Sequence, residues 1–290
     1  MGWVQLLLEP LGYAFMVRGL LAVMLVGVVC AAVGTYMVLR GMAFFGDALA
    51  HAILPGVAVG YLAGGGVQGS LFWWALAAAV LTSIGIGALS RATRLKEDTA
   101  IGIVFAGMFA LGIALISTVR SYSVDLVHFL FGDVLGVSDS DLLWMGLFGG
   151  VIVLTVLLFY KEFLVLSFDS TLATTLRLPT RFFEYLLLVL IAVAIVVSLK
   201  TVGVTLMVAM LITPAATASL LSRRLPVLMV LAAGIGAASG VIGLYLSFYV
   251  NVASGSAIVL TCTAVFALTW LGRTVQRARR DRAPRPVASA

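Results

Sequence analysis

Residues 40–60 read RGMAFFGDALAHAILPGVAVG and contain one carboxylate and one imidazole, Asp47 and His51, in an otherwise apolar, small-residue segment. Their i, i+4 spacing places both side chains on one face of a helix, one turn apart. With Arg40 at a water boundary, a rise of about 1.5 Å per residue puts Asp47 roughly 10 Å and His51 roughly 16 Å into a hydrocarbon core about 30 Å thick. Ionisable groups at that depth indicate a substrate or ion pathway.

Pro55 comes four residues after His51. Because proline has no N–H, the carbonyl of His51 loses its helical partner, and an acidic oxygen, an imidazole nitrogen and a carbonyl are expected at one depth. Carboxylate plus imidazole suits a divalent metal, and Zn²⁺, Mn²⁺ and Fe²⁺ all accept that pair. The alternative is an Asp–His hydrogen bond that satisfies itself inside the bundle. The position within a membrane favours the metal site.

The composition is that of a polytopic membrane protein. The chain has 290 residues, of which 62% are hydrophobic and 10% charged, and its mean hydropathy is +1.18. Cys30 and Cys262 lie in apolar runs, which favours packing roles over a disulfide or a thiolate metal cluster. The net charge of +6 is concentrated in the tail after Arg273, which indicates an anchor at the membrane surface rather than a nucleic-acid site.

The apolar segments predict an all-α bundle of eight or nine transmembrane helices. Residues 1–272 form one transmembrane domain in this interpretation, and 273–290 form a basic, disordered tail. The second segment is interrupted by Pro55 and the seventh by Pro214, and interrupted helices at depth are buried in protein or line a cavity. The segments are 13–39, 48–63, 71–89, 99–119, 142–160, 183–199, 202–221, 227–248 and 256–272.

Glycine pairs at helix-packing spacing recur along the chain. Helices in lipid associate by close backbone approach, so such pairs predict a tight bundle. They are Gly56 and Gly60, Gly146 and Gly150, and Gly236 and Gly240.

The basic residues predict an orientation. With the C-terminus in the cytoplasm and sides alternating, all of the 18 basic residues except Arg18, Arg120 and Lys200 fall on the inner side. Positive charge gathers on the cytoplasmic side of membrane proteins, so this topology is favoured. Nine spans then place the N-terminus outside.

The outer loop from Arg120 to Asp141 is longer than a plain connection requires. Its central apolar run is too short to span, which indicates a re-entrant or interfacial element. It holds His128, with Asp125 one turn before it. We expect these two residues to form an external gate over the pore.

The inner loop from Lys161 to Arg181 is also long. Asp169 and Ser170 can cap a short helix that ends before Pro179, which predicts a cytoplasmic helix parallel to the membrane. The expected coupling segment comprises Phe168, Asp169, Leu172, Leu176 and Pro179.

Several catalytic motifs are missing from the sequence. It has no G-x-x-x-x-G-K-[ST] phosphate loop, so an ATP-driven step requires a partner subunit. It has no H-E-x-x-H, and the AASG at 237–240 falls short of a serine-protease motif. The chain is therefore expected to be a transport subunit rather than an enzyme.

At this point the motifs indicate a family. RGMAFFGDALAHAILPG resembles the signature segment of the membrane permeases of manganese and zinc ABC importers. DLVHFLFGDVLGVS, FDSTLATTLRLP and VGVTLMVAMLITPAATA resemble that family's later motifs in the same order. The resemblance covers roughly Arg18 to Arg273 and implies a fold like that of the vitamin B12-type (type II) importers.

The resemblance also implies partners and a substrate. In such permeases two copies form the pore in the cell membrane, cytoplasmic ATPase subunits dock on coupling helices, and an extracytoplasmic binding protein delivers the metal. No cofactor is held permanently. Asp47 and His51 match the family's proposed metal site. His128 matches a position where manganese-type members often have histidine and zinc-type members often do not. The resemblance therefore favours manganese as the substrate, with zinc as the next candidate. The family usually has glycine where this chain has Arg177.

Three other functions are open to such a chain. In a proton-coupled metal carrier, Asp47 and His51 would relay protons. An uncoupled channel is a weaker alternative. A scaffolding membrane protein would not need an Asp–His pair at mid-membrane depth.

Overall fold

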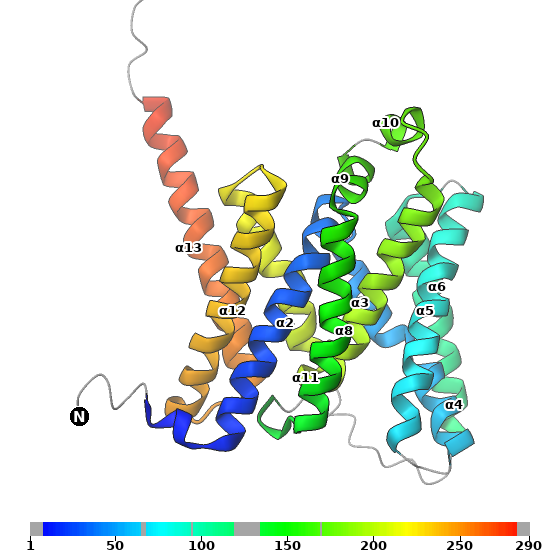
Figure 1. The fold of residues 1–290 in the computed structure, drawn as a ribbon, viewed down its shortest axis with the longest axis horizontal. Helices are drawn as coiled ribbons and strands as arrows, with labels where there is room; N and C mark the ends of the chain where they lie inside the picture. The colour runs from blue at the N-terminus through cyan, green and yellow to red at the C-terminus, as the bar shows by residue number, and fades with distance from the viewer. Residues whose placement is uncertain (1–7, 65–67, 94, 119–133, 169, 283–290) are drawn as a thin grey trace, which may run out of the picture.

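The computed structural model describes residues 8–64, 68–93, 95–118, 134–168 and 170–282. Within these ranges the chain forms helices and no strand (Figure 1). The elements are η1 (Pro10–Gly12), α2 (Ala14–Leu39), α3 (Phe44–Ala52), α4 (Leu54–Gly64), α5 (Gln68–Thr93), α6 (Glu97–Ser117), η2 (Val134–Gly136), α8 (Asp139–Leu158), α9 (Tyr160–Phe168), α10 (Ser170–Thr175), α11 (Thr180–Leu221), α12 (Leu225–Val250) and α13 (Ser254–Arg282).

Helix α11 turns back on itself. Its 42 residues would span roughly 60 Å if straight, about twice a hydrocarbon core. Gly203 has φ 77° and ψ 171°, a backbone conformation essentially restricted to glycine, and it divides α11 into two arms. Both ends of α11 lie at the same end of the bundle as α10 (Figure 1). Lys200, three residues before Gly203, pairs with Asp141 near the start of α8.

The two ends of the bundle are named here by their landmarks. The α10 end contains α9, α10 and the turn between α11 and α12, at the top of Figure 1. The opposite, Lys200 end contains the start of α8, since Nζ of Lys200 lies 2.7 Å from Oδ1 of Asp141. Eight described stretches are long and apolar enough to cross a membrane, with α11 counted once. The two arms of α11 correspond to two of the nine predicted segments, 183–199 and 202–221.

The second apolar segment crosses the bundle as two helices. Together α3 and α4 supply a candidate span from Phe44 to Ala63. The break falls at Ile53, between the two helices, so that Pro55 lies in the first turn of α4, where its missing N–H has no helical partner to lose. The prediction of an interrupted helix is confirmed, with the break just before the proline.

The predicted break at Pro214 is wrong. Pro214 lies within the second arm of α11, where the backbone stays helical, and the residue with non-helical φ and ψ is Gly203. The hydroxyl of Thr217 donates to the carbonyl of Thr213 at 2.7 Å beside the proline. Proline removes the N–H that would otherwise reach the carbonyl of Met210, and the helix nevertheless continues past it.

Close backbone approach holds the centre of the bundle together. Helix α2 and both arms of α11 carry long buried faces, and a Cβ at Gly34 would collide with the carbonyl of Leu211. Gly56 and Gly60 of α4 pack on Trp74 of α5 in the same way.

Of the other two predicted glycine pairs, one packs against another helix and one does not. Gly236 of α12 approaches Gly27 of α2, and Gly240 packs on Val23, so that pair is an interface as predicted. Gly146 and Gly150 of α8 have no described neighbour within contact of a Cβ, so their face does not pack inside this chain.

Helix α13 runs further than its apolar segment. The sequence predicted the last span to end at 272, whereas the helix continues to Arg282, into the segment expected to be a disordered tail. The Nη2 of Arg273 donates to the carbonyl of Leu221 at 2.7 Å and so caps the C-terminal end of α11. This contact ties α13 to the bundle at the α10 end.

Candidate functional site

Asp47 and His51 both lie on α3, on the face turned away from the core. Phe45, Ala48 and Leu49 are fully buried on the opposite side of the helix. The Nε2 of His51 lies 3.7 Å from Oδ1 of Asp47, and the two side chains are 28% and 42% exposed. The i, i+4 prediction of a shared face is therefore confirmed. The pair lies on a partly open surface of the single chain rather than in a sealed cavity.

The predicted third group, the carbonyl of His51, is not free. Because α3 ends at Ala52, the N–H of Ile53 turns back to the carbonyl oxygen of His51. Within the described residues, no cluster of three or more histidine, cysteine, aspartate or glutamate side chains could hold a metal ion. Asp47 and His51 thus stand as a pair, without a third such side chain clustered with them in the described part of the chain.

Two phenylalanines of α6 form one wall beside the imidazole. The ring centroid of His51 lies 5.9 Å from that of Phe109 and 6.3 Å from that of Phe105. The two phenylalanines stack on each other with centroids 5.7 Å apart. Sequence reasoning missed both residues, although their own i, i+4 spacing is the signal that would have placed them on one face of α6.

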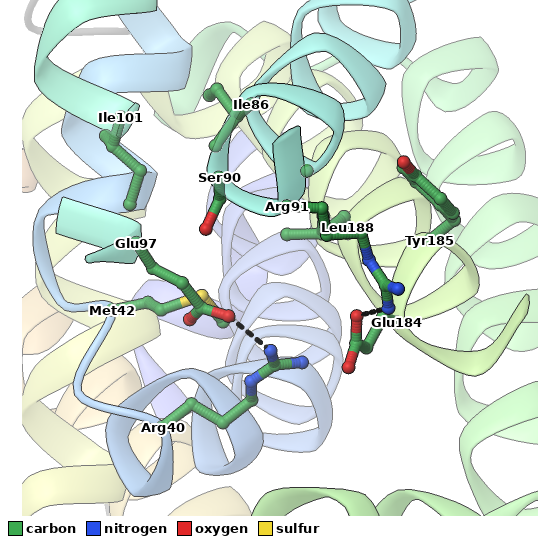
Figure 2. A pocket seen from close by; sticks show the side chains of 11 residues that line it. Arg40, Met42, Ile86, Ser90, Arg91, Glu97, Ile101, Glu184, Tyr185 and Leu188 are labelled. Carbon is green, nitrogen blue, oxygen red and sulfur yellow. Dashed lines mark hydrogen bonds and ion pairs between the residues drawn. The ribbon is translucent and has the colours of Figure 1, made fainter. Parts of the chain in front are cut away.

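At the α10 end, two ion pairs flank a small cavity of about 30 Å³ (Figure 2). Nη2 of Arg40, at the end of α2, lies 2.5 Å from Oε1 of Glu97, the first residue of α6. Arg91 in the last turn of α5 pairs with Glu184 of α11. The sequence interpretation used Arg40 only as a water boundary and missed these pairs, which join residues far apart along the chain.

The first of these pairs constrains α3 and α6, the helices that carry the Asp47–His51 pair and its aromatic wall. Arg40 directly precedes the turn into α3, and Glu97 begins the helix that carries Phe105 and Phe109. The acidic N-terminus of α6 and the basic C-terminus of α2 also each complement their helix dipole. The pair therefore fixes the start of α3 relative to the aromatic wall of the site.

At the Lys200 end, Lys200 is held between an acid and an aromatic ring. Its Nζ pairs with Asp141 and lies 5.6 Å from the ring centroid of Phe72. Ser138 and Asp141 form a capping box at the start of α8. A cavity of about 150 Å³, also lined by Trp73 and Trp144, lies beside these groups.

The predicted inner helix is present as two short helices, α9 and α10. Phe168, Leu172 and Leu176 are 62%, 47% and 57% exposed, which leaves an apolar surface at the tip of the α10 end. Pro179 is the N-cap of α11, so the segment leads directly into the first arm of that helix. Asp169 lies outside the described residues.

Asp125 and His128 also lie outside the described residues. The external gate that they were expected to form therefore stays a prediction from the sequence. The described part of the outer loop begins at Val134, which is fully buried against the bundle in η2.

A multi-spanning helical bundle with the polar pair Asp47 and His51 in an interrupted helix is typical of a membrane transport protein. Residues 12–272 match the family model described as the ABC 3 transport family. The chain belongs to this family, whose members sit in the cell membrane as permease subunits of ABC importers and are not enzymes themselves.

Named relatives cover most of the chain. A manganese transport system membrane protein (MntC) of Halalkalibacterium halodurans is 46% identical over 263 residues, covering 90% of this chain and 88% of the relative. A probable iron transport system membrane protein of Haemophilus influenzae is 38% identical, covering 90% and 95%. The solved structure of PsaBC from Streptococcus pneumoniae in complex with a Fab is similar with a TM-score of 0.78 and 38% identity, covering 92% of this chain and 95% of that one.

Proposed function

We propose that this chain is the permease of an ATP-driven importer for a divalent transition metal, with manganese the first candidate and zinc the next. The observation that carries the proposal is the Asp47–His51 pair, with Nε2 and Oδ1 3.7 Å apart on an open face of α3. The carboxylate offsets the charge of a desolvated cation and the neutral imidazole supplies a nitrogen ligand. Relatives named for manganese support this choice, and one named for iron keeps Fe²⁺ among the metals to be tested.

Two copies of the chain complete the metal site in this proposal. A divalent transition metal takes four to six ligands, whereas one copy offers a carboxylate and an imidazole. Asp47 and His51 are partly exposed, and their neighbour α6 is largely unburied within the chain. A second copy facing this surface would bring a second pair and bury both. The metal would then cross the membrane between the two copies.

The α10 end faces the cytoplasm in this proposal. Of the described basic residues, Arg18 and Lys200 lie at the Lys200 end, while arginines of the α10 end include Arg40, Arg91 and Arg177. The positive-inside bias therefore favours a cytoplasmic α10 and a cytoplasmic C-terminus. Leu172 of α10 and Leu176 directly after it then contact an ATPase subunit. An extracytoplasmic binding protein delivers metal at the Lys200 end. Asp125 and His128 would gate that entrance.

A proton-coupled carrier was the alternative. Its mechanism would need neither a cytoplasmic docking surface nor a partner ATPase. Family membership and the exposed apolar surface of Leu172 and Leu176 support the ATP-driven mechanism instead.

The test is metal-dependent ATP hydrolysis by the complex reconstituted in proteoliposomes with its ATPase and binding protein. We expect Mn²⁺ to stimulate hydrolysis and to enter the vesicles, with Zn²⁺ and Fe²⁺ compared at equal free concentration. Metal entry driven by a pH gradient in the absence of ATP would contradict the proposal. Stimulation by Zn²⁺ or Fe²⁺ alone would contradict the assignment of manganese.

A further inference from the structure

Helix α10 ends in a hydrogen-bonded cap that normally uses glycine. The N–H of Leu178 donates to the carbonyl of Ala173 at 3.1 Å, and the N–H of Arg177 donates to the carbonyl of Thr174 at 3.0 Å. These two bonds are those of a Schellman motif, in which the residue at the Arg177 position adopts a left-handed conformation. Arg177 has φ 55°. A residue with a Cβ is strained at such a position relative to glycine.

Arginine is an unexpected residue at this position. Within the described ranges, the non-glycine residues with positive φ are Arg177 and Asn251. Asparagine is enriched in the left-handed region, whereas arginine gains nothing there from its backbone. Strain that is maintained at a surface position points to a use for the side chain itself.

The surroundings of Arg177 indicate what the side chain could bind. Arg177 is exposed and directly follows the apolar surface formed by Leu172 and Leu176. Arg181 follows in the first turn of α11. Among the described residues, neither arginine has an acidic partner within ion-pair distance. Among the described residues, the apolar surface therefore carries positive charge at its edge without an acidic partner.

We propose that Arg177 binds a carboxylate of the ATPase subunit at the rim of the cleft that receives α10. The inference rests on the proposed function, in which Leu172 and Leu176 enter that cleft. A guanidinium offers a planar fork that pairs with a carboxylate through two parallel hydrogen bonds. The apolar surface supplies the buried contact, and Arg177 selects an ATPase whose cleft has an acidic rim.

The test separates the strain of Arg177 from its charge. Arg177→Gly removes the guanidinium and relieves the backbone, whereas Arg177→Gln removes the guanidinium and keeps the strain. Both variants are purified in the full permease dimer, and the affinity of the purified ATPase subunit is measured together with the melting temperature. We expect both to bind the ATPase about tenfold more weakly, as for the loss of one charge-assisted contact. The loss should be larger at low ionic strength.

The melting temperature should rise only in Arg177→Gly, because only that variant relieves the backbone. Arg223→Gln is the matched control, because it removes one exposed charge from the turn between α11 and α12 at the same end. It should leave the affinity unchanged.

Two results would overturn the inference. If Arg177→Gly binds the ATPase as tightly as the wild type, the side chain of Arg177 does not contribute to ATPase binding. If Arg223→Gln weakens binding equally, the effect is one of net charge. A different variant tests the proposed function. If Leu172→Asp binds the ATPase like the wild type, α10 is not the docking element. The proposed role of Arg177 is then also excluded.

Discussion

Arg91, in the last turn of α5, forms an ion pair with Glu184, in the second turn of α11, only a few residues after α10. Arg91 also lies over the ring of Tyr185, with its guanidinium carbon 5.7 Å from the centroid. Helix α5 in turn packs on the glycines of α4, in the span that carries Asp47 and His51. A chain of contacts thus leads from the start of α11, shortly after α10, to the span that carries Asp47 and His51.

The first prediction concerns this chain of contacts. Glu184→Gln removes the charge with little change in shape, so movement of α10 should reach α5 less effectively. We expect metal transport per ATP hydrolysed to fall several-fold while the complex still assembles. Both side chains are partly exposed, so solvent screening limits the effect on stability. Transport and hydrolysis in proteoliposomes measure the ratio.

Two further variants sharpen that test. Exchange of the two charges, with Arg91→Glu and Glu184→Arg combined, should restore part of the ratio. Asp139→Asn is the control, because its pair with Arg18 is exposed, is 3.9 Å long and lies at the other end of the bundle. An unchanged ratio in Glu184→Gln would mean that the pair only holds the two helices together.

The second prediction concerns the turn inside α11. Gly203→Ala places a Cβ at φ 77° and ψ 171°, which should cost about 1–3 kcal/mol of folding stability. Gly85→Ala in α5 is the control, because nothing lies within 4 Å of its Cβ. Thermal unfolding in detergent should show a lower melting temperature for Gly203→Ala alone. Equal melting temperatures would show that the two arms join without a glycine-specific conformation.

The third prediction concerns the exposed Leu172 of α10 and the exposed Leu176 directly after it. Leu172→Asp and Leu176→Asp each place a charge on a surface that is proposed to enter an apolar cleft, where a charge without a partner is costly. Both variants should insert and fold normally but lose assembly with the ATPase or metal-stimulated hydrolysis. Leu221→Asp, an exposed leucine at the same end on α11, is the matched control. Normal coupled turnover in both α10 variants would remove the docking assignment.

The membrane spans were predictable because each requires a long apolar run, which is a local property of the sequence. The two arms of α11 were separated for the same reason, as 183–199 and 202–221. The uninterrupted helix at Pro214, in the second arm, was not predictable in this way. Proline at 214 removes one backbone hydrogen bond, but whether the helix breaks there depends on how the neighbouring helices pack against it.

In the candidate site too, local features were predictable from the sequence and tertiary contacts were not. The shared face of Asp47 and His51 follows from their spacing alone. The aromatic wall of Phe105 and Phe109 comes from another helix, so it depends on tertiary packing that a single sequence does not reveal. The pair of Arg40 with Glu97 likewise joins residues 57 positions apart. The unusual arginine at 177 was visible in the sequence, but its strain was visible only once φ was known.

The last prediction concerns the metal site. Asp47→Asn keeps the size of the side chain and deletes the charge that offsets a desolvated divalent cation. His51→Ala deletes a nitrogen ligand and leaves the aspartate without its neighbour. We expect either change to abolish metal uptake at limiting metal, while the complex assembles and hydrolyses some ATP. Cys30→Ser should do neither, because Cys30 is buried in α2, where its Sγ lies 3.8 Å from Oγ of Ser198.

A mixed complex extends this prediction to the two copies. When one wild-type copy is paired with one His51→Ala copy, a site shared between copies should lose most of its uptake, whereas two independent sites should keep about half. Uptake of radioactive Mn²⁺ into proteoliposomes, with the mixed dimer isolated through two different affinity tags, distinguishes the two. If the Asp47→Asn and His51→Ala homodimers took up metal like the wild type, residues 40–60 would have only a packing role. The binding site for the metal would then lie elsewhere in the bundle.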